Sequence, residues 1–289
     1  MAHWEFPGSD PIDVFIDLAA GQIALTAGPT DVTTVDLTTS GRGRDEAPPA
    51  DVRVSFEDGR LEIAGPRRSG LWRSHAGLDL AVTLPAGSRC LVRTASADVS
   101  CTGDLAELDV HTASGDVQAG TVTGRSKIQT ASGDVQLDEA GADADLHTAG
   151  GDIELARAGG AVTVRTASGD VNIGAAATSV TVMTSSGDVE LGSAAAGRTD
   201  VKTVSGDIVV GVPPGVGVYL DLAAVTGATV SQLDETGASD DIPLEVVCRS
   251  VSGDIRIARA SGAYSAPPPP RSFPALPTVN IPETPPSAS

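Results

Sequence analysis

Apolar and polar residues alternate in short runs along the middle of the chain, and the same run returns at a nearly constant interval. Each copy matches or closely resembles the phrase Thr-x-Ser-Gly-Asp-Val, with apolar residues two positions before the threonine and two positions after the valine. Such alternation is typical of a strand with one buried face, and the Ser-Gly pair interrupts it where a tight bend is needed. The pattern therefore predicts two short strands per copy, separated by a glycine corner.

The spacing of these copies predicts the architecture. Eight copies are recognisable by their aspartates: Asp98, Asp116, Asp134, Asp152, Asp170, Asp188, Asp207 and Asp254. The first five steps are 18 residues and the sixth is 19. A fixed period of this size is typical of one supersecondary unit stacked on copies of itself. We therefore predict an all-β, single-domain β-solenoid, similar to a parallel β-helix, with about 18 residues per coil.

The repeat also sets the expected domain limits. Residues 76–210 carry the regular coils, and the flanking residues 1–75 and 211–264 are expected to add irregular coils or caps to the same domain. Gly21-Gln-Ile-Ala-Leu and Gly59-Arg-Leu-Glu-Ile resemble the second half of the motif, and Gly227-Ala-Thr-Val marks a further turn between Asp207 and Asp254. Residues 265–289 are rich in proline, which cannot donate to a strand ladder, so we expect them to be disordered.

Composition and charge narrow the classes of function. Aromatic residues make up only 3%, which suits a thin core between short strands, and the net charge of −19 repels phosphate backbones and anionic membranes. We therefore expect a protein partner, no nucleic acid and no membrane insertion.

Three cysteines without Cys-x-x-Cys spacing favour reduced thiols. With no basic stretch followed by an apolar run at the amino terminus, we expect a cytoplasmic location.

The column of corner aspartates is the first candidate site. In-register stacking would place neighbouring carboxylates about 4.8 Å apart, where they repel each other by roughly 0.9 kcal/mol even in water. We expect each carboxylate to accept hydrogen bonds from backbone amides at its glycine corner. A row of calcium ions is the alternative, because carboxylates are hard oxygen ligands. The prediction is a structural ladder that holds no metal.

A second column, directly before the repeated threonines, is mostly cationic. Its charged members are Arg93, His111, His147, Arg165, Lys202 and Arg249, with Gln129 and Met183 between them. Their parity places them on the outside, so they either offset the aspartate ladder or form an interaction stripe. A zinc site shared by His111 and His147 is geometrically poor, because two coils, or about 9.6 Å, separate their backbones.

The remaining columns offer little chemistry. The repeated threonines share the parity of inward valines, which favours a hydrogen-bonded inner ladder over a flat ice-binding face. The sequence has no Gly-x-Ser-x-Gly elbow, no phosphate-binding loop and no His-Glu-x-x-His motif. The Ser-Gly-Asp phrase recurs in coil after coil, as a structural corner requires. We therefore predict no enzyme, no catalytic residues and no cofactor.

The serial Thr-x-Ser-Gly-Asp-Val phrases, the Leu84-Pro-Ala-Gly lead-in and the early Gly21-Gln-Ile-Ala-Leu segment resemble the bacterial toastrack family over about residues 10–260. That family often carries the label "putative adhesin" and is otherwise a domain of unknown function. The resemblance implies a β-solenoid-like domain, often found in proteins of cell-envelope stress sensing and regulation. It implies no catalytic residues.

Three hypotheses of function follow. The first is a non-enzymatic interaction module or scaffold for an unidentified protein partner, in envelope stress sensing or regulation. The second is an exported adhesin or glycan-binding protein, and the third is a carbohydrate-active enzyme. Solenoid ends also expose unpaired strand edges, so self-association through the ends is a further expectation.

Overall fold

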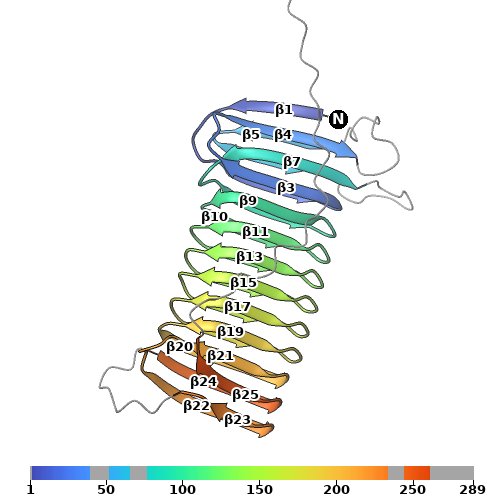
Figure 1. Ribbon diagram of the computed structural model, residues 1–289. Coiled ribbons are helices and arrows are strands. Elements are labelled where there is room, and N and C mark those ends of the chain that lie inside the picture. The colour runs from blue at the N-terminus through green and yellow to red at the C-terminus, as the bar shows by residue number, and fades with distance from the viewer. Residues whose placement is uncertain (1, 40–51, 66–76, 234–243, 261–289) are drawn as a thin grey trace, which may run out of the picture.

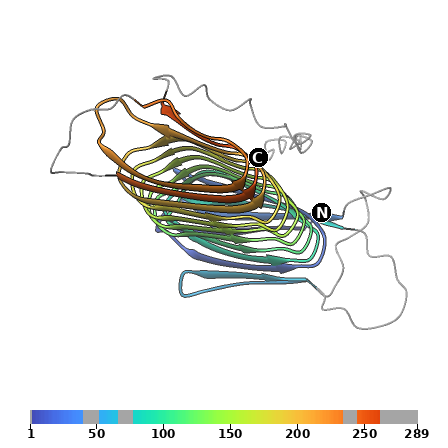
Figure 2. The same cartoon turned by 90° about the horizontal axis from the view of Figure 1, so that it is seen from below.

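The computed structural model describes residues 2–39, 52–65, 77–233 and 244–260, and the Pro-rich segment lies outside this range. In the described part of the chain, strands form two sheets of 13 and 12 strands, here named sheet A and sheet B. Figure 1 shows their strands stacked into a rod, and Figure 2 shows each coil along the rod as a flattened ring. The predicted all-β solenoid is confirmed.

Each regular coil contributes one strand to each sheet, with the glycine corner between them. In spatial order, sheet A consists of β1 (Ala2–Pro7), β4 (Val32–Thr39), β7 (Leu78–Pro85), β3 (Gly21–Gly28), β9 (Asp98–Leu105), β11 (Val117–Val122), β13 (Val135–Ala140), β15 (Ile153–Ala158), β17 (Val171–Ala176), β19 (Val189–Ala194), β21 (Ile208–Val212), β25 (Ile255–Arg259) and β23 (Thr229–Ser231).

Sheet B extends along the same stack, and its first strand lies at the carboxyl-terminal end of the rod. It consists of β22 (Val218–Thr226), β24 (Leu244–Ser252), β20 (Gly197–Ser205), β18 (Val180–Met183), β16 (Val162–Arg165), β14 (Ala144–His147), β12 (Ser126–Gln129), β10 (Glu107–His111), β8 (Arg89–Thr94), β2 (Asp13–Leu18), β6 (Arg60–Ala64) and β5 (Arg53–Glu57). Neighbouring strands of the regular coils are parallel, and equivalent residues pair, as Val117 does with Val135.

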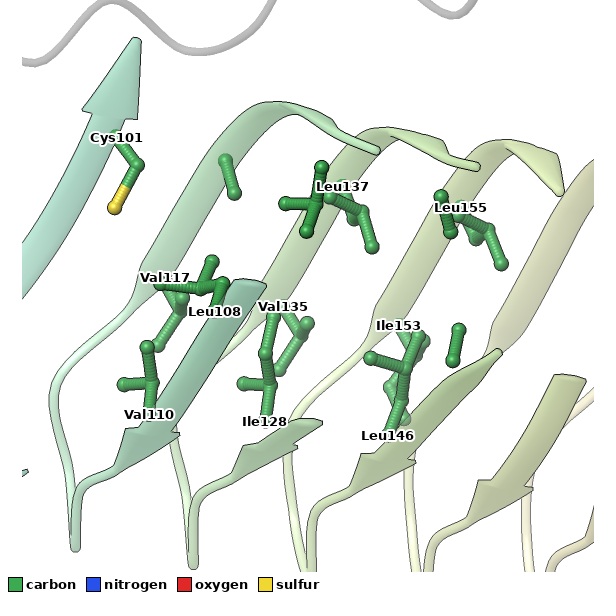
Figure 3. Packing of buried hydrophobic residues seen from close by; sticks show 14 of the residues in the cluster. Cys101, Leu108, Val110, Val117, Ile128, Val135, Leu137, Leu146, Ile153 and Leu155 are labelled. Atoms are coloured by element: carbon green, nitrogen blue, oxygen red, sulfur yellow. The ribbon is translucent and has the colours of Figure 1, made fainter. Parts of the chain in front are cut away.

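The core is the narrow layer between the sheets. Sheet B contributes Val110, Ile128 and Leu146, and sheet A contributes Val135 and Ile153, each at most 1% exposed. Figure 3 shows these side chains pointing into the same space from both sheets. Full burial of such a side chain contributes about 1.5–3 kcal/mol, and the stack repeats this contribution in every coil. Aliphatic residues fill so thin a layer without aromatic rings.

The corner glycines are required by how closely the coils stack. A Cβ atom on Gly187 would lie 2.1 Å from the carbonyl oxygen of Gly169 in the preceding coil. Gly187 also has a φ of +136°, which side chains with a Cβ rarely adopt. The Ser-Gly pair is thus fixed by contact between coils as well as by the bend.

The amino-terminal end departs from a simple repeat. β4 pairs antiparallel with both β1 and β7, and β5 pairs antiparallel with β6. The expectation that Gly59-Arg-Leu-Glu-Ile repeats the second half of the motif is wrong, because β6 belongs to sheet B whereas β3 belongs to sheet A. The chain reverses in a hairpin turn at Asp58 and Gly59. Gly59 therefore does not lie at a corner between the two sheets, although the sequence around it resembles the motif.

Chain order and spatial order differ at both ends. The coil β2–β3 lies between β6–β7 and β8–β9, although it comes first in the sequence. At the other end β24–β25 lies between β20–β21 and β22–β23. The expectation of serial turns between Asp207 and Asp254 is therefore wrong. Residues 213–217 carry the chain past the place next to β20–β21, which β24–β25 occupies. The Arg259 guanidinium donates hydrogen bonds to the Pro213 and Val216 carbonyl oxygens of this segment.

Candidate functional site

The repeated threonine bonds the backbone of its own corner in most coils. Thr166 and Thr184 donate to the Ser168 and Ser186 carbonyl oxygens, and Thr203 Oγ1 has no partner among the described residues. The Oγ1 atoms of Thr130 and Thr148 each accept a hydrogen bond of 3.0 Å from the backbone amides of Gly133 and Gly151, three residues ahead. Both threonines are buried, as the inward parity of their column predicts. A hydroxyl that bonds the backbone of its own turn is a structural group.

The corner aspartates join one coil to the next. In each case Oδ1 accepts the backbone amide of the equivalent residue in the neighbouring coil, at distances of 2.7–3.1 Å. This holds for Asp98, Asp116, Asp134, Asp152, Asp170, Asp188, Asp207 and Asp254. The last bond runs from Asp254 to the amide of Ala228. β22–β23 is the outermost coil of the described residues, so no further coil presents an amide to the side chain at position 228. The position is accordingly occupied by alanine, which has no carboxylate.

This geometry defines what the ladder can do chemically. Each carboxylate commits one oxygen to a backbone amide, which places negative charge beside a bond donor and offsets the repulsion along the column. The described residues contain no group of three or more His, Cys, Asp or Glu side chains arranged to hold a metal ion. The ladder therefore acts as a series of links between coils.

The cationic column lies on the outer face of sheet B, in register from coil to coil. His111 stands beside Arg93, Gln129 separates the two histidines, and Lys202 stands beside Arg249. One role that the sequence predicts for this column is to neutralise the corner aspartates. Within the described ion pairs, its members contact other carboxylates on the sheet B face.

The individual partners of this column are local. His111 Nε2 lies 2.9 Å from Asp109, Lys202 Nζ lies 3.0 Å from Asp200, and Arg249 lies 2.9 Å from Asp221. The His111 contact has the distance of an ion pair, but Asp109 Oδ1 accepts no hydrogen bond, whereas Lys202 Nζ also donates a hydrogen bond of 3.2 Å to Asp200 Oδ2. Such exposed pairs contribute about 0–1 kcal/mol each.

His147 is hydrogen-bonded to Arg165 of the next coil. Its Nε2 lies 3.0 Å from Arg165 Nη1, and the same nitrogen lies 2.8 Å from Asp145 Oδ1, which accepts no hydrogen bond. With the guanidinium as donor, Nε2 is the acceptor of this pair. The remaining member, Arg93, lies over the Phe15 ring at 5.7 Å from its centroid.

Beside Arg93 and His111 the outer face of sheet B is hollowed into a depression of about 410 Å³. It crosses β6, β2, β8 and β10 and reaches the start of β12. We name it the sheet B depression, and its outward-facing residues are Asp13, Phe15, Arg60, Arg89, Leu91, Glu107, Asp109, Arg125 and Lys127. Phe15 and Leu91 provide half-buried apolar surface, and the other seven residues are charged.

The charges of this depression are only partly paired. Arg89 lies between two carboxylates, 3.4 Å from Asp13 and 3.9 Å from Glu107. Arg60, Arg125 and Lys127 have no carboxylate within ion-pair distance among the described residues. Three cations thus border an apolar patch without a direct ion pair, and together with Arg89 they outnumber the carboxylates of Asp13, Glu107 and Asp109 in the depression, on a chain whose net charge is −19. An acidic group beside an apolar side chain fits this arrangement.

A family model matches residues 13–258, which cover most of the chain and both sheets. The chain belongs to the Toastrack DUF4097 family. No curated protein matches this toastrack chain.

Solved structures with similar folds carry adhesin names. A "putative adhesin" from Bacteroides fragilis matches at 14% identity and a TM-score of 0.44, covering 89% of this chain and 96% of that one. One from Parabacteroides distasonis matches at 13% identity and a TM-score of 0.39, with the same shares covered. A "putative cell adhesion protein" from Clostridium sporogenes matches at 12% identity and 0.24, covering 89% and 99%.

The cysteines of the toastrack domain are poor nucleophiles. Cys90, Cys101 and Cys248 are free and buried. Burial raises the pKa of Cys101 and of Cys248 to about 12, with the Asp200 carboxylate adding to the effect at Cys248, and raises the pKa of Cys90 as well. The thiolate is the reactive form, so these groups are unreactive at neutral pH. Among the described residues no helix is long and apolar enough to cross a membrane.

The sheet B depression was missed by reasoning from the sequence. Strand parity identifies Arg89, Glu107 and Arg125 as outward, and the 18-residue offset places them in one row. The repeat therefore suffices to predict this row. It does not predict that the row continues to Asp13 and Arg60, because β2 pairs with both β8 and β6, which are not its neighbours in the sequence.

Proposed function

We propose that this toastrack domain is a non-enzymatic protein-interaction module that binds an acidic segment of a protein partner in the sheet B depression. The observation that carries the proposal is the group of Arg60, Arg125 and Lys127, which lack carboxylate partners around half-buried Phe15 and Leu91. Charge-assisted hydrogen bonds to such cations are about twice as strong as neutral ones.

The scaffold favours recognition over catalysis. The depression lies on strands that are bonded on both sides, so its side chains keep fixed spacing without ordering a loop. Arginine and aromatic side chains at the centre of an interface often contribute most of its binding energy. The acidic exterior repels other anionic surfaces, and the unpaired cations attract a carboxylate at one place, which supports selective binding.

The test compares two double variants with the same change in charge. Arg125→Gln/Lys127→Gln removes two cations from the depression, and Arg53→Gln/Arg256→Gln removes two exposed cations elsewhere. We expect capture of the partner from native lysate to weaken by at least about tenfold with the first variant only. Equal retention by both variants, or no protein that depends on Arg125 and Lys127, would overturn the proposal.

The family resemblance extends this proposal to a biological setting. We propose that the partner belongs to a regulatory circuit of cell-envelope stress and that binding occurs in the cytoplasm. Cell fractionation tests the location. A chromosomal Arg125→Gln/Lys127→Gln strain tests the setting, because its response to envelope damage should match that of a deletion strain and differ from that of the Arg53→Gln/Arg256→Gln strain.

A further inference from the structure

The two ends of the solenoid differ in strand direction and in whether aromatic side chains close the space between the sheets. At the amino-terminal end β1 and β5 are the outermost strands, and they pair antiparallel with β4 and β6. Phe6 of sheet A and Phe56 of sheet B stack there with ring centroids 5.0 Å apart, which closes the space between the sheets. At the other end, the parallel strands β22 and β23 are outermost in their sheets, as Figure 1 shows. Within the described residues no strand pairs with their outer edges.

Side chains that line the core reach the surface at this carboxyl-terminal end. Leu220 and Leu222 of β22 are only partly buried, whereas their neighbours in β24, Val246 and Cys248, are 0% exposed. Exposed large apolar residues also gather here. The described chain has six, namely Met183, Val204, Tyr219, Val225, Val230 and Val251, and all but Met183 lie in the last three coils. Such clustering marks an interaction surface.

We propose that two copies of the chain join at this end, with β22 of each copy pairing antiparallel about a two-fold axis at Leu222. A strand at the edge of a sheet offers a row of backbone donors and acceptors to another strand. A two-fold axis makes the same edge complementary to itself, and it closes the assembly at two copies. The nine residues of β22 contain no proline, so each can take part in the ladder.

In this register apolar side chains of the two copies meet on both faces of β22. On the inner face Leu222 meets Leu222 of the second copy, and Leu220 meets Ala224, so the apolar core continues through the junction. On the outer face Tyr219 meets Val225, which are 55% and 76% exposed in a single copy. Cross-strand pairs of an aromatic and a β-branched side chain stabilise antiparallel strands.

Charge is also balanced across the junction. Asp221 is the acidic residue of β22, and it meets Ala223 of the second copy, so the two aspartates are not directly opposite. Arg249 neighbours Ala223 in β24 and already lies 2.9 Å from Asp221 of its own copy. In this register each Asp221 faces Ala223 of the second copy with Arg249 behind it, and it also contacts Arg249 of its own copy. The charges of Asp221 and Arg249 thus balance along this row, although each chain carries a net charge of −19.

The size of the end is sufficient for a specific interface. A nine-residue strand is about 30 Å long, and two sheets about 10 Å apart with their outer side chains are about 20 Å thick. Each copy would bury roughly 500 Å², or about 1,000 Å² in total, which reaches the lower limit of specific interfaces.

A disulfide test identifies the register directly. In Tyr219→Cys/Val225→Cys, each new thiol faces the other position of the second copy, with Cα atoms about 5 Å apart and within disulfide reach. Within one copy the two positions are about 20 Å apart, so they cannot join. Oxidised glutathione should yield a covalent dimer of the double variant and leave each single variant monomeric under denaturing conditions. Absence of that dimer, or equal cross-linking by a single variant, would overturn the proposal.

Sedimentation of the full chain provides the second test. We expect Val225→Asp to raise the dimer dissociation constant by at least about tenfold, because it places a carboxylate against the Tyr219 ring of the second copy at both symmetry-related ends of the contact. Val204→Asp makes the same change at a 54% exposed position two strands further in and should leave the constant unchanged. A monomeric wild type, or equal effects of both substitutions, would show that a second copy does not cover β22.

Discussion

At the scale of the residue, two side chains of the repeated phrase have separate structural tasks. Threonine bonds the turn of its own coil, and aspartate bonds the amide of the next coil. The glycine between them has no room for a side chain, because the preceding coil's backbone lies where its Cβ would be. The phrase is therefore repeated for stacking, and its regularity carries no information about a ligand.

Substitution of one ladder aspartate measures the link between coils. Asp152→Ala leaves the Asp170 amide without its acceptor, and we expect the free energy of unfolding to fall by about 1–2 kcal/mol, since water replaces part of an exposed bond. Asp152→Asn keeps an acceptor oxygen and should lose less. Urea denaturation checks both variants. The control Asp138→Ala removes an exposed carboxylate near Glu154 and should not destabilise the domain, because Asp138 contributes to the raised pKa of Glu154 by repulsion.

At the scale of the element, the sequence predicts the regular coils well and the ends poorly. Strand parity and the 18-residue period place Val110, Val135 and Ile153 in the core and Arg165 outside, as found. The ends differ because any coil can pair with any other through the same parallel ladder. β24–β25 carries the Ser-Gly-Asp corner and lies next to β20–β21 with a buried inner face, whereas β22–β23, which has Ala228 in place of the aspartate, lies outermost.

The amino-terminal edge strand β1 is expected to depend on pH. His3 of β1 donates to Glu5 and to Asp36 of β4, with Asp36 Oδ1 at 2.7 Å. The Glu5 contact, and then the Asp36 contact, raise the pKa of His3 above its ordinary 6.5. A raised pKa in the folded state means that the stabilisation is fully present below about pH 6.5 and is lost as pH rises through the folded value.

Hydrogen exchange measures this dependence. Amides of β1 and β4, after correction for intrinsic exchange rates, should be better protected at about pH 5.5 than at about pH 8.5. His3→Gln should abolish the difference, and His111→Gln, which changes a histidine on sheet B, should leave it intact. Equal protection of wild-type β1 at both pH values would contradict this role of His3.

At the scale of the whole molecule, a solenoid behaves as a linear array in which each coil contacts only its neighbours. Its stability therefore need not be uniform along the rod. At the amino-terminal end the Phe6–Phe56 stack covers the space between the outermost strands, whereas the carboxyl-terminal end has no such stack among the described residues and its edge is open. Coils near the open edge should separate from the stack more readily than those near the covered end, unless a second copy pairs with them.

The three buried cysteines report this difference without any substitution. Cys90 and Cys101 lie near the covered end, and Cys248 lies in β24, next to the outermost strand. Because burial holds their pKa high, each thiol reacts with a maleimide only after its coil opens. At low protein concentration we expect Cys248 to be labelled first. Raising the concentration should slow Cys248 alone, since dimerisation protects only its end, and Val225→Asp should remove that slowing. Mass spectrometry of labelled peptides gives all three rates from one sample, and a Cys248 rate that is independent of concentration would argue against pairing through β22.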